Sequence, residues 1–165
     1  MNDIKLSRRT ALAWLGIGVS LPVLTACGSA PVQAQTFPVT RTEAQWRSRL
    51  SDMQFRVLRE QATERAFTSP LDDEKRAGMF HCAGCDNAVY SSRHKFDSGT
   101  GWPSFYRTAD NGSVGLSSDR LLGYERVEAH CADCGGHLGH VFDDGPAPTG
   151  KRHCINGVAL VFKPA

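Results

Sequence analysis

Two pairs of cysteines in this 165-residue chain have the spacing of a metal site. Cys82 and Cys85 form one Cys-x-x-Cys pair, and Cys131 and Cys134 form the other. Two such turns supply the four thiolates of a tetrahedral zinc ion. The stretch 86–130 between the pairs is longer than the gap in a zinc ribbon, so the metal would join the two ends of a small domain. The sequence therefore predicts one structural zinc ion on these four cysteines.

Two other interpretations of the same cysteine pairs stay open. Each pair could be a redox-active dithiol, or each could form a disulfide in an oxidising compartment. A disulfide between cysteines three positions apart closes a very short loop and therefore contributes little stability. Paired Cys-x-x-Cys motifs are, in contrast, among the more specific sequence signals of a zinc site.

Cys154 stands outside both pairs, and a cysteine left over in this way is either a reactive thiol or a small buried residue. Arg152 and His153 come directly before it, and nearby positive charge lowers the pKa of a thiol. Asn156 would share a face with Cys154 on a strand predicted over 153–162. These neighbours favour thiol redox chemistry at Cys154.

His137 and His140 are spaced three residues apart, upstream of the lone thiol. They could ligate a metal, but no carboxylate or third histidine completes the set. A proton donor or acceptor beside the thiol is the better interpretation. Trp102, bracketed by Gly101 and Pro103, is either a core residue or an aromatic wall held at a fixed angle. The other histidines are predicted to be surface residues: His81, His94, His130 and His153.

The elements that must position these side chains are short. Residues 40–43 and 51–54 each place a Ser or Thr three residues before a Glu or Gln, which is capping-box spacing and predicts two short helices. From Met79 onward, short alternating segments are separated by turn residues, and Asn111-Gly112 predicts a hairpin. The predicted fold class is mainly β (α+β), with antiparallel strands behind a helical lead-in.

The first 40 residues are predicted to be a targeting segment. Residues 1–26 have the layout of a secretory signal, with a basic start followed by an apolar run. Their twin arginine resembles the signal of the Tat pathway, which exports folded proteins. Residues 24–27 resemble a bacterial lipobox, which implies cleavage before Cys27 and a lipid on its sulfur. Ordinary signal cleavage, for example after Ala34, is the alternative.

Residues 27–40 are predicted to be a tether and residues 41–165 a folded domain, in a periplasmic or other extracytoplasmic location. A membrane anchor would be present if Cys27 carries lipid. Removing residues 1–26 takes 3 of 19 basic and 1 of 17 acidic residues, which leaves 16 of each. A neutral mature domain argues against nucleic acid as a partner, because phosphate binding needs a surplus of Lys and Arg.

The chain resembles the peptide-methionine (R)-S-oxide reductases over roughly residues 41–162. Four stretches carry the resemblance: 80–85, 96–105, 134–142 and 152–156. The resemblance implies two antiparallel sheets with short N-terminal helices, and zinc on the four paired cysteines away from the active site. It also implies that methionine-R-sulfoxide, free or in proteins, is the substrate. The preference for the R epimer follows from the resemblance alone, and we expect the protein to be a monomer.

The resemblance further implies the roles of the site residues. Cys154 would attack the sulfoxide sulfur and become a sulfenic acid. Three residues around it would hold the sulfoxide oxygen and supply protons: His137, His140 and Asn156. Trp102 would pack against the S-methyl group as an aromatic wall. Arg152 would bind the substrate.

Thr100 is a departure from that family. Many members carry a cysteine at this position, just before Gly-Trp-Pro, which attacks the sulfenic acid. We therefore predict a one-cysteine cycle, in which a thioredoxin-like or small-thiol reductant reduces Cys154 directly. Two other classes stay open. In a zinc-ribbon protein-binding module Cys154 would be dispensable, and in a peroxide-consuming thiol enzyme Trp102 would have no role.

Overall fold

The computed structural model describes residues 36–110, 112–120, 123 and 125–165. The predicted export signal, the lipobox with Cys27 and most of the predicted tether lie outside the described residues, and so does Asn111. Among the helices that are described, none has the length and apolar character needed to cross a membrane.

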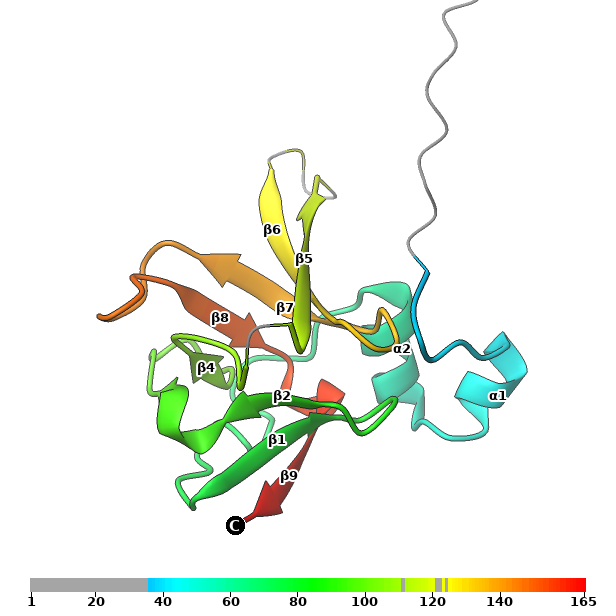
Figure 1. Ribbon diagram of the computed structural model, residues 1–165, viewed down its shortest axis with the longest axis horizontal. Coiled ribbons are helices and arrows are strands. Elements are labelled where there is room, and N and C mark those ends of the chain that lie inside the picture. The colour runs from blue at the N-terminus through cyan, green and yellow to red at the C-terminus, as the bar shows by residue number, and fades with distance from the viewer. Residues whose placement is uncertain (1–35, 111, 121–122, 124) are drawn as a thin grey trace, which may run out of the picture. The chain divides into compact units, whose positions relative to one another are not determined.

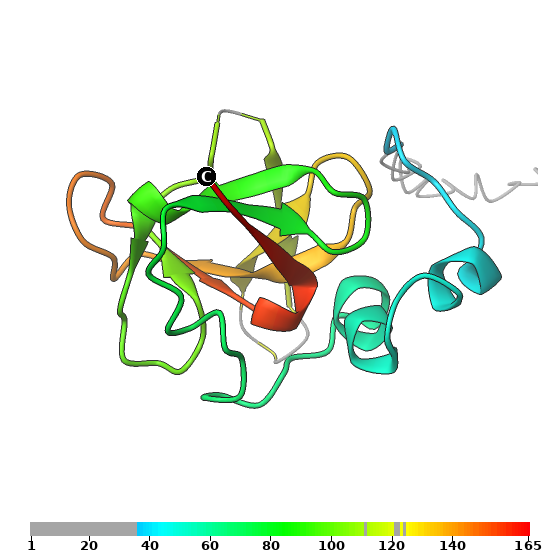
Figure 2. The same ribbon diagram turned by 90° about the horizontal axis from the view of Figure 1, so that it is seen from below.

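Nine short strands in the described residues form two antiparallel sheets, which confirms the predicted fold class (Figure 1). The smaller sheet has the order β2-β1-β9, and the larger has the order β3-β4-β8-β7-β6-β5. Figure 2 views the molecule from the side of the smaller sheet. The strands are β1 (Gly78–Cys82), β2 (Ala88–Ser91), β3 (Lys95–Phe96), β4 (Ser104–Phe105), β5 (Val114–Asp119), β6 (Arg126–Cys131), β7 (His137–Phe142), β8 (Arg152–Ile155) and β9 (Leu160–Pro164), with 3-10 turns η1 (Ser92–His94) and η2 (Gly157–Ala159).

Helix α1 (Glu43–Arg47) is a short lead-in whose start is set by Thr42. The Thr42 hydroxyl accepts a hydrogen bond from the Gln45 backbone N–H, and the Gln45 side chain accepts one from the Thr42 backbone N–H. The capping box predicted at 40–43 is therefore wrong by two residues. The residue directly before the first helical turn is the one whose hydroxyl reaches the unpaired N–H groups, and that residue is Thr42.

Helix α2 (Asp52–Glu60) begins at the second predicted capping box, which is confirmed. The Ser51 hydroxyl accepts from the Gln54 backbone N–H, and the Gln54 side chain accepts from the Ser51 backbone N–H. The helix ends at Gln61, which adopts a left-handed conformation with φ 55°. One face of α2 contacts β7 and η2 and buries Phe55, Val57 and Leu58.

The hairpin predicted at Asn111-Gly112 is wrong. The strands on either side, β4 and β5, do not pair, because β4 lies next to β8 while β5 lies at the far edge of the sheet beside β6. The connection is instead closed by Asp110, whose carboxylate accepts a hydrogen bond from the Ser113 backbone N–H at 3.0 Å. A turn-forming dipeptide marks where the chain turns, but it does not determine which strands pair.

The prediction of a single strand over 153–162 is also wrong, because this segment contributes to two strands that belong to different sheets. β8 ends at Ile155, and β9 begins at Leu160 in the smaller sheet. Between them the carboxylate of Glu64 accepts hydrogen bonds from the backbone N–H groups of η2, which turns the chain from one sheet to the other. The predicted shared face of Cys154 therefore does not continue past Ile155.

Aromatic rings fill the space between the two sheets. Tyr90 of β2 stacks on Phe105 of β4 with ring centroids 4.4 Å apart, and Phe80 of β1 meets the same ring edge-on at 5.0 Å. The Tyr90 hydroxyl lies 3.1 Å from Nδ1 of His153. His153 is therefore a core residue that joins the sheets, and the prediction of a surface histidine is wrong. His130 is likewise buried.

His153 makes stability depend on pH. Burial lowers the pKa of His153 to about 4, from an ordinary value of 6.5. Between these values the unfolded chain binds a proton that the folded protein does not, so the free energy of unfolding falls as pH falls from 6.5 towards 4, by about 3 kcal/mol. We expect His153→Phe, which cannot titrate, to show a weaker pH dependence of urea unfolding over this range. If the free energy of unfolding changed equally with pH in the variant and the wild type, His153 would not be the source of the pH dependence.

Candidate active site

The lone thiol lies on the outer face of the larger sheet. Cys154 on β8 is opposite Ser104 on β4 and opposite His140 on β7. Opposite residues of antiparallel strands share a face, as do alternate residues of one strand. Arg152 therefore lies on this face too, while His153 points into the core. We call the face that carries Cys154, Ser104, His140 and Arg152 the outer face.

A chain of hydroxyl groups ends at the sulfur of Cys154. The Thr100 hydroxyl oxygen lies 3.9 Å from Cys154 Sγ and 2.8 Å from the hydroxyl oxygen of Ser98. The Ser98 oxygen in turn lies 2.7 Å from that of Ser104. Because these groups are linked to one another, the Thr100 hydroxyl is held in position to donate a hydrogen bond to the sulfur.

The pKa of the Cys154 thiol is raised above its ordinary value. Burial is the main cause, and the Thr100 hydroxyl and the Arg152 guanidinium offset it only in part. Arg152 lowers this pKa as expected, but the predicted net lowering is wrong, because burial of the sulfur outweighs the charge. At neutral pH Cys154 keeps its proton until something removes it.

Arg152 is fixed beside the thiol by two hydrogen bonds. Its Nε and Nη2 donate to the two carboxylate oxygens of Asp144 at 2.8 and 2.9 Å. The guanidinium also lies over the ring of Phe142, 4.5 Å from the centroid. Bidentate pairing holds the planar group in one orientation, so the outer face has an immobile positive charge next to Cys154.

His137 and His140 are each held by a carboxylate that lies on another strand of the larger sheet. His137 is buried, and its Nδ1 lies 2.7 Å from a carboxylate oxygen of Glu128 on β6. Although burial alone would raise it, the pKa of Glu128 is lowered, because His137 and Ser117 donate hydrogen bonds to the carboxylate. An ionised carboxylate accepts only, so His137 donates from Nδ1 to Glu128.

The second pair joins His140 on β7 to Asp119 on β5. Nε2 of His140 lies 2.7 Å from Oδ2 of Asp119, and the same oxygen also contacts Arg126. Burial lowers the pKa of His140, even though Asp119 opposes this. His140 is therefore neutral near pH 7, with Nε2–H donated to Asp119 and Nδ1 left as an acceptor. The rings of His137 and His140 lie 5.2 Å apart, centroid to centroid.

Asn156 and Trp102 are joined to each other through the backbone of Glu64. The Glu64 backbone N–H donates to the Asn156 side-chain oxygen at 2.9 Å, and the Glu64 carbonyl accepts from the Trp102 indole N–H at 3.1 Å. The Asn156 side-chain amide also donates to the Leu138 carbonyl at 3.0 Å. Asn156 is buried by these contacts, whereas Trp102 stays half-exposed.

Sequence reasoning did not anticipate the three carboxylates of this site: Glu64, Asp119 and Glu128. The only available signal concerned Glu128, a charged residue at an alternate position of a predicted strand. Asp119 and Glu64 become recognisable only when the register of the larger sheet and the path of the chain after α2 are known.

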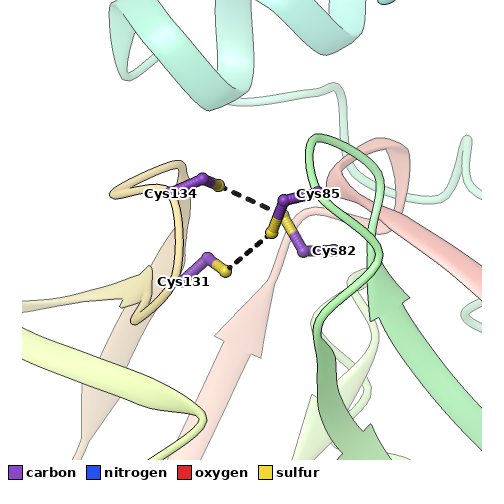
Figure 3. Close-up of side chains that lie close together, drawn as sticks. All are labelled: Cys82, Cys85, Cys131 and Cys134. Atoms are coloured by element: carbon purple, nitrogen blue, oxygen red, sulfur yellow. Dashed lines mark hydrogen bonds between the residues drawn. The ribbon is translucent and has the colours of Figure 1, made fainter. Parts of the chain in front are cut away.

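The four paired cysteines converge at one end of the two sheets (Figure 3). Their sulfur atoms all lie within 4.8 Å of one another. The shortest separations join different pairs, with Cys82 Sγ 3.7 Å from Cys134 Sγ and Cys85 Sγ 3.4 Å from Cys131 Sγ. Zinc–sulfur bonds of about 2.3 Å in a tetrahedron place sulfurs roughly 3.8 Å apart, whereas a disulfide requires about 2.05 Å. The donor set therefore fits zinc, and it connects β1 to β6.

Comparison with known proteins finds a match to the SelR domain family over residues 50–164. A peptide methionine sulfoxide reductase MsrB from Methylibium petroleiphilum is 50% identical over 126 residues, which are 76% of this chain and 91% of that protein. One of the same name from Thiobacillus denitrificans is 52% identical, over 75% of this chain and 94% of that protein. A third, from the archaeon Methanosarcina barkeri, is 49% identical, over 76% of this chain and 88% of that protein.

The Thr100 contact predicts a measurable effect on the thiol. Thr100→Val removes the only hydroxyl that the described residues place at Cys154 Sγ, so we expect it to raise the pKa of Cys154 further. The rate of alkylation by iodoacetamide as a function of pH, followed on the peptide that contains Cys154, reports this pKa. Thr100→Ser keeps the donor and is the matched control. An unchanged pKa of Cys154 in Thr100→Val would show that the Thr100 hydroxyl does not affect the thiol.

Proposed function

This chain belongs to the peptide-methionine (R)-S-oxide reductase family, and we propose that it reduces methionine-R-sulfoxide to methionine through a sulfenic acid on Cys154. The observation that carries the proposal is the composition of the outer face. In the described residues, the one thiol outside the cysteine cluster lies opposite one histidine, with a second histidine close by, and each histidine is held by its own carboxylate. Removal of oxygen from a sulfoxide requires these groups: a thiol to attack the sulfur and a proton donor for the oxygen.

The chemical step moves one oxygen atom between two sulfurs. The sulfur of Cys154 attacks the sulfoxide sulfur and forms a transient sulfur–sulfur bond. This bond and the sulfur–oxygen bond of the substrate then break as a sulfur–oxygen bond forms on Cys154. The methionine sulfur gains two electrons and the Cys154 sulfur loses two. The thiol proton ends on the transferred oxygen, so Cys154 becomes a neutral sulfenic acid and no other proton is consumed.

The resting protonation states of the site are compatible with a proton relay through His140, because Cys154 holds a proton and His140 can accept one. The raised pKa of Cys154 and the lowered pKa of His140 keep both groups neutral at rest. We propose that His140, whose Nδ1 is an acceptor, takes the thiol proton as the sulfur attacks and passes it to the sulfoxide oxygen. Asp119 would stabilise the imidazolium formed between these events. His137, oriented by Glu128, would bind the oxygen or supply the same proton through water.

Other residues would hold the substrate rather than react with it. Trp102 would wall the S-methyl group, and its tie to the Glu64 carbonyl fixes one edge of the indole. Arg152 would stabilise negative charge as it develops on the sulfur and oxygen. The engagement of Asn156 with Glu64 and Leu138 supports a positioning role for this side chain, which would maintain the turn that follows Cys154.

Thr100 supports regeneration by an external thiol, thioredoxin-like or small. The hydroxyl lies where a second thiol would have to be in order to attack the sulfenic acid. Without a second thiol in the protein, one external thiol would form a mixed disulfide with Cys154 and release water. A second thiol would then attack this disulfide, free Cys154 and leave as the oxidised reductant.

We also propose that residues 1–26 direct export, so that the domain works outside the cytoplasm as a monomer. The twin arginine and the apolar run behind it support this. A lipid on Cys27 would anchor the domain through the segment 27–40, and the intact mass of protein extracted from membranes tests that attachment.

One structural zinc ion on the cysteine cluster is the cofactor we propose. Because the ion would connect β1 to β6, its removal should destabilise the domain as a whole. We expect one zinc per chain by elemental analysis, and we expect Cys131→Ser to lose zinc and more than about 3 kcal/mol of unfolding free energy. Cys154→Ser, the matched control, should keep both. A zinc-free wild-type protein with an unchanged melting temperature would contradict the assignment.

The one-cysteine cycle predicts the product of a single turnover. With methionine-R-sulfoxide and no reductant, we expect one equivalent of methionine and a Cys154 sulfenic acid that dimedone traps, detected by mass spectrometry. Cys154→Ser should form no methionine.

Thr100→Cys is the control that makes this result informative. It places a thiol at the position of the Thr100 hydroxyl, so the same experiment should yield an intramolecular disulfide between residues 100 and 154. A disulfide to Cys154 in the wild-type protein would refute the one-cysteine cycle.

A further inference from the structure

Phe67 is the most exposed large apolar side chain in the part of the chain that the structure describes, with 73% of its surface accessible. An exposed apolar residue is common and by itself carries no information. Its backbone is unusual, however, because φ is 62°. A residue with a Cβ adopts this left-handed conformation only at a conformational cost. Such outliers persist where the surrounding structure enforces them, and they concentrate at functional sites.

The surrounding contacts enforce this conformation. The Phe67 backbone N–H donates to the Gly101 carbonyl at 2.8 Å. Gly101 has φ 84°, and a Cβ built on it would lie 2.7 Å from Cδ2 of the Phe67 ring. Both the backbone conformation and the close approach of the ring therefore require glycine at position 101. The ring is held against Gly101 along one edge, while the rest of it faces solvent.

The segment that carries Phe67 runs along the residues of the proposed active site. Gly101 lies between Thr100, whose hydroxyl is 3.9 Å from Cys154 Sγ, and Trp102. Before Phe67, the backbone of Glu64 bonds to Trp102 and to Asn156. The segment is therefore anchored to both sides of the loop that approaches the thiol.

The segment is anchored after Phe67 as well. The side chain of Ser69 occupies the space beside Gly157, so closely that a Cβ there would lie 1.9 Å from its oxygen. With anchors on both sides, the position of the exposed ring is set by the same residues that hold Trp102 and the turn after Cys154.

We infer that Phe67 is a binding surface for the residues on either side of an oxidised methionine, so that apolar residues beside the methionine sulfoxide increase the affinity for a peptide substrate. This inference rests on the function proposed above. A methionine side chain reaches only a few bonds from its own backbone. With the sulfoxide at Cys154 and the methyl group against Trp102, a ring beyond Gly101 can contact neighbouring residues of a peptide, and free methionine sulfoxide has none.

Stability does not account for an aromatic residue at this position. A side chain that is almost three-quarters exposed gains little from burial in the folded monomer, and the left-handed backbone opposes it. A ring that is already immobilised loses little entropy when a partner covers it, which favours binding. The partner that fits is an extended peptide with apolar side chains beside its oxidised methionine.

The test compares three substrates with the full-length, zinc-loaded protein and dithiothreitol as reductant. They are free methionine-R-sulfoxide, a blocked heptapeptide with methionine-R-sulfoxide between leucines, and the same peptide with glycines in place of the leucines. For Phe67→Ala we expect kcat/KM on the leucine peptide to fall about tenfold, mainly through KM. The glycine peptide should lose less, and free methionine sulfoxide should change less than twofold.

Two further variants keep the result interpretable. Phe67→Leu retains an apolar side chain and should keep most of the activity on the leucine peptide. Leu116→Ala removes another exposed apolar side chain, on β5, and should change none of the three substrates. Melting temperatures of all variants identify any that fail to fold.

Two outcomes would overturn the inference. Equal losses on all three substrates would mean that Phe67 only supports the loop of Trp102, and no loss on the leucine peptide would mean that the ring has no partner there. A wild-type protein that reduces neither peptide nor free methionine sulfoxide would instead refute the proposed function, and the inference with it. The free amino acid thus separates the two failures.

Discussion

The alternation of side chains along β8 is the constraint on which the rest of this structure depends. His153 and Ile155 point into the core, and Arg152 and Cys154 point to the outer face. A shift of one residue in the pairing would bury the thiol and expose the core. β8 pairs with a strand on each side, β4 and β7, so both neighbours fix the same register. The precision of the site is therefore a consequence of how the core is packed.

Three carboxylates, those of Glu64, Asp119 and Glu128, hold the outer face in its arrangement. Removing a carboxylate from water is costly unless hydrogen bonds replace the lost hydration. Here the replacing donors include backbone N–H groups of η2 for Glu64, and a histidine nitrogen beside other donors for each of the other two. Among the interactions that compensate each carboxylate is thus one that orients a residue of the proposed site. Stability and catalysis therefore depend on the same bonds, in a small domain that has few to spare.

Local signals made part of this molecule predictable. The start of α2 depends on Ser51 and Gln54 alone, and the sets of paired and unpaired cysteines are visible from spacing. What could not be predicted depends on contacts between distant segments. Alternation divides 152–155 into two faces, but it does not say which face another sheet covers, so the burial of His153 was missed.

The same physical reason explains the other errors. The end of β8 is set by Glu64, which lies far away in the sequence. The direction of the Cys154 pKa was wrong because the charge of Arg152 is visible in a sequence, while the burial of the sulfur is not. Pairing of Asp119 with His140 requires the register of three strands.

The pairing of the first strand with the last has a consequence for how the protein is made. Gly78 on β1 is opposite Pro164 on β9, so the smaller sheet is completed by a strand that lies far along the chain from its first strand. Pairings between such distant segments form late, because a long loop must close first. During synthesis the smaller sheet cannot close until β9 has been translated and has left the ribosome. A nascent chain that stalls before β9 will therefore carry the five cysteines of the described domain, of which Cys82 lies on β1, before that sheet has formed.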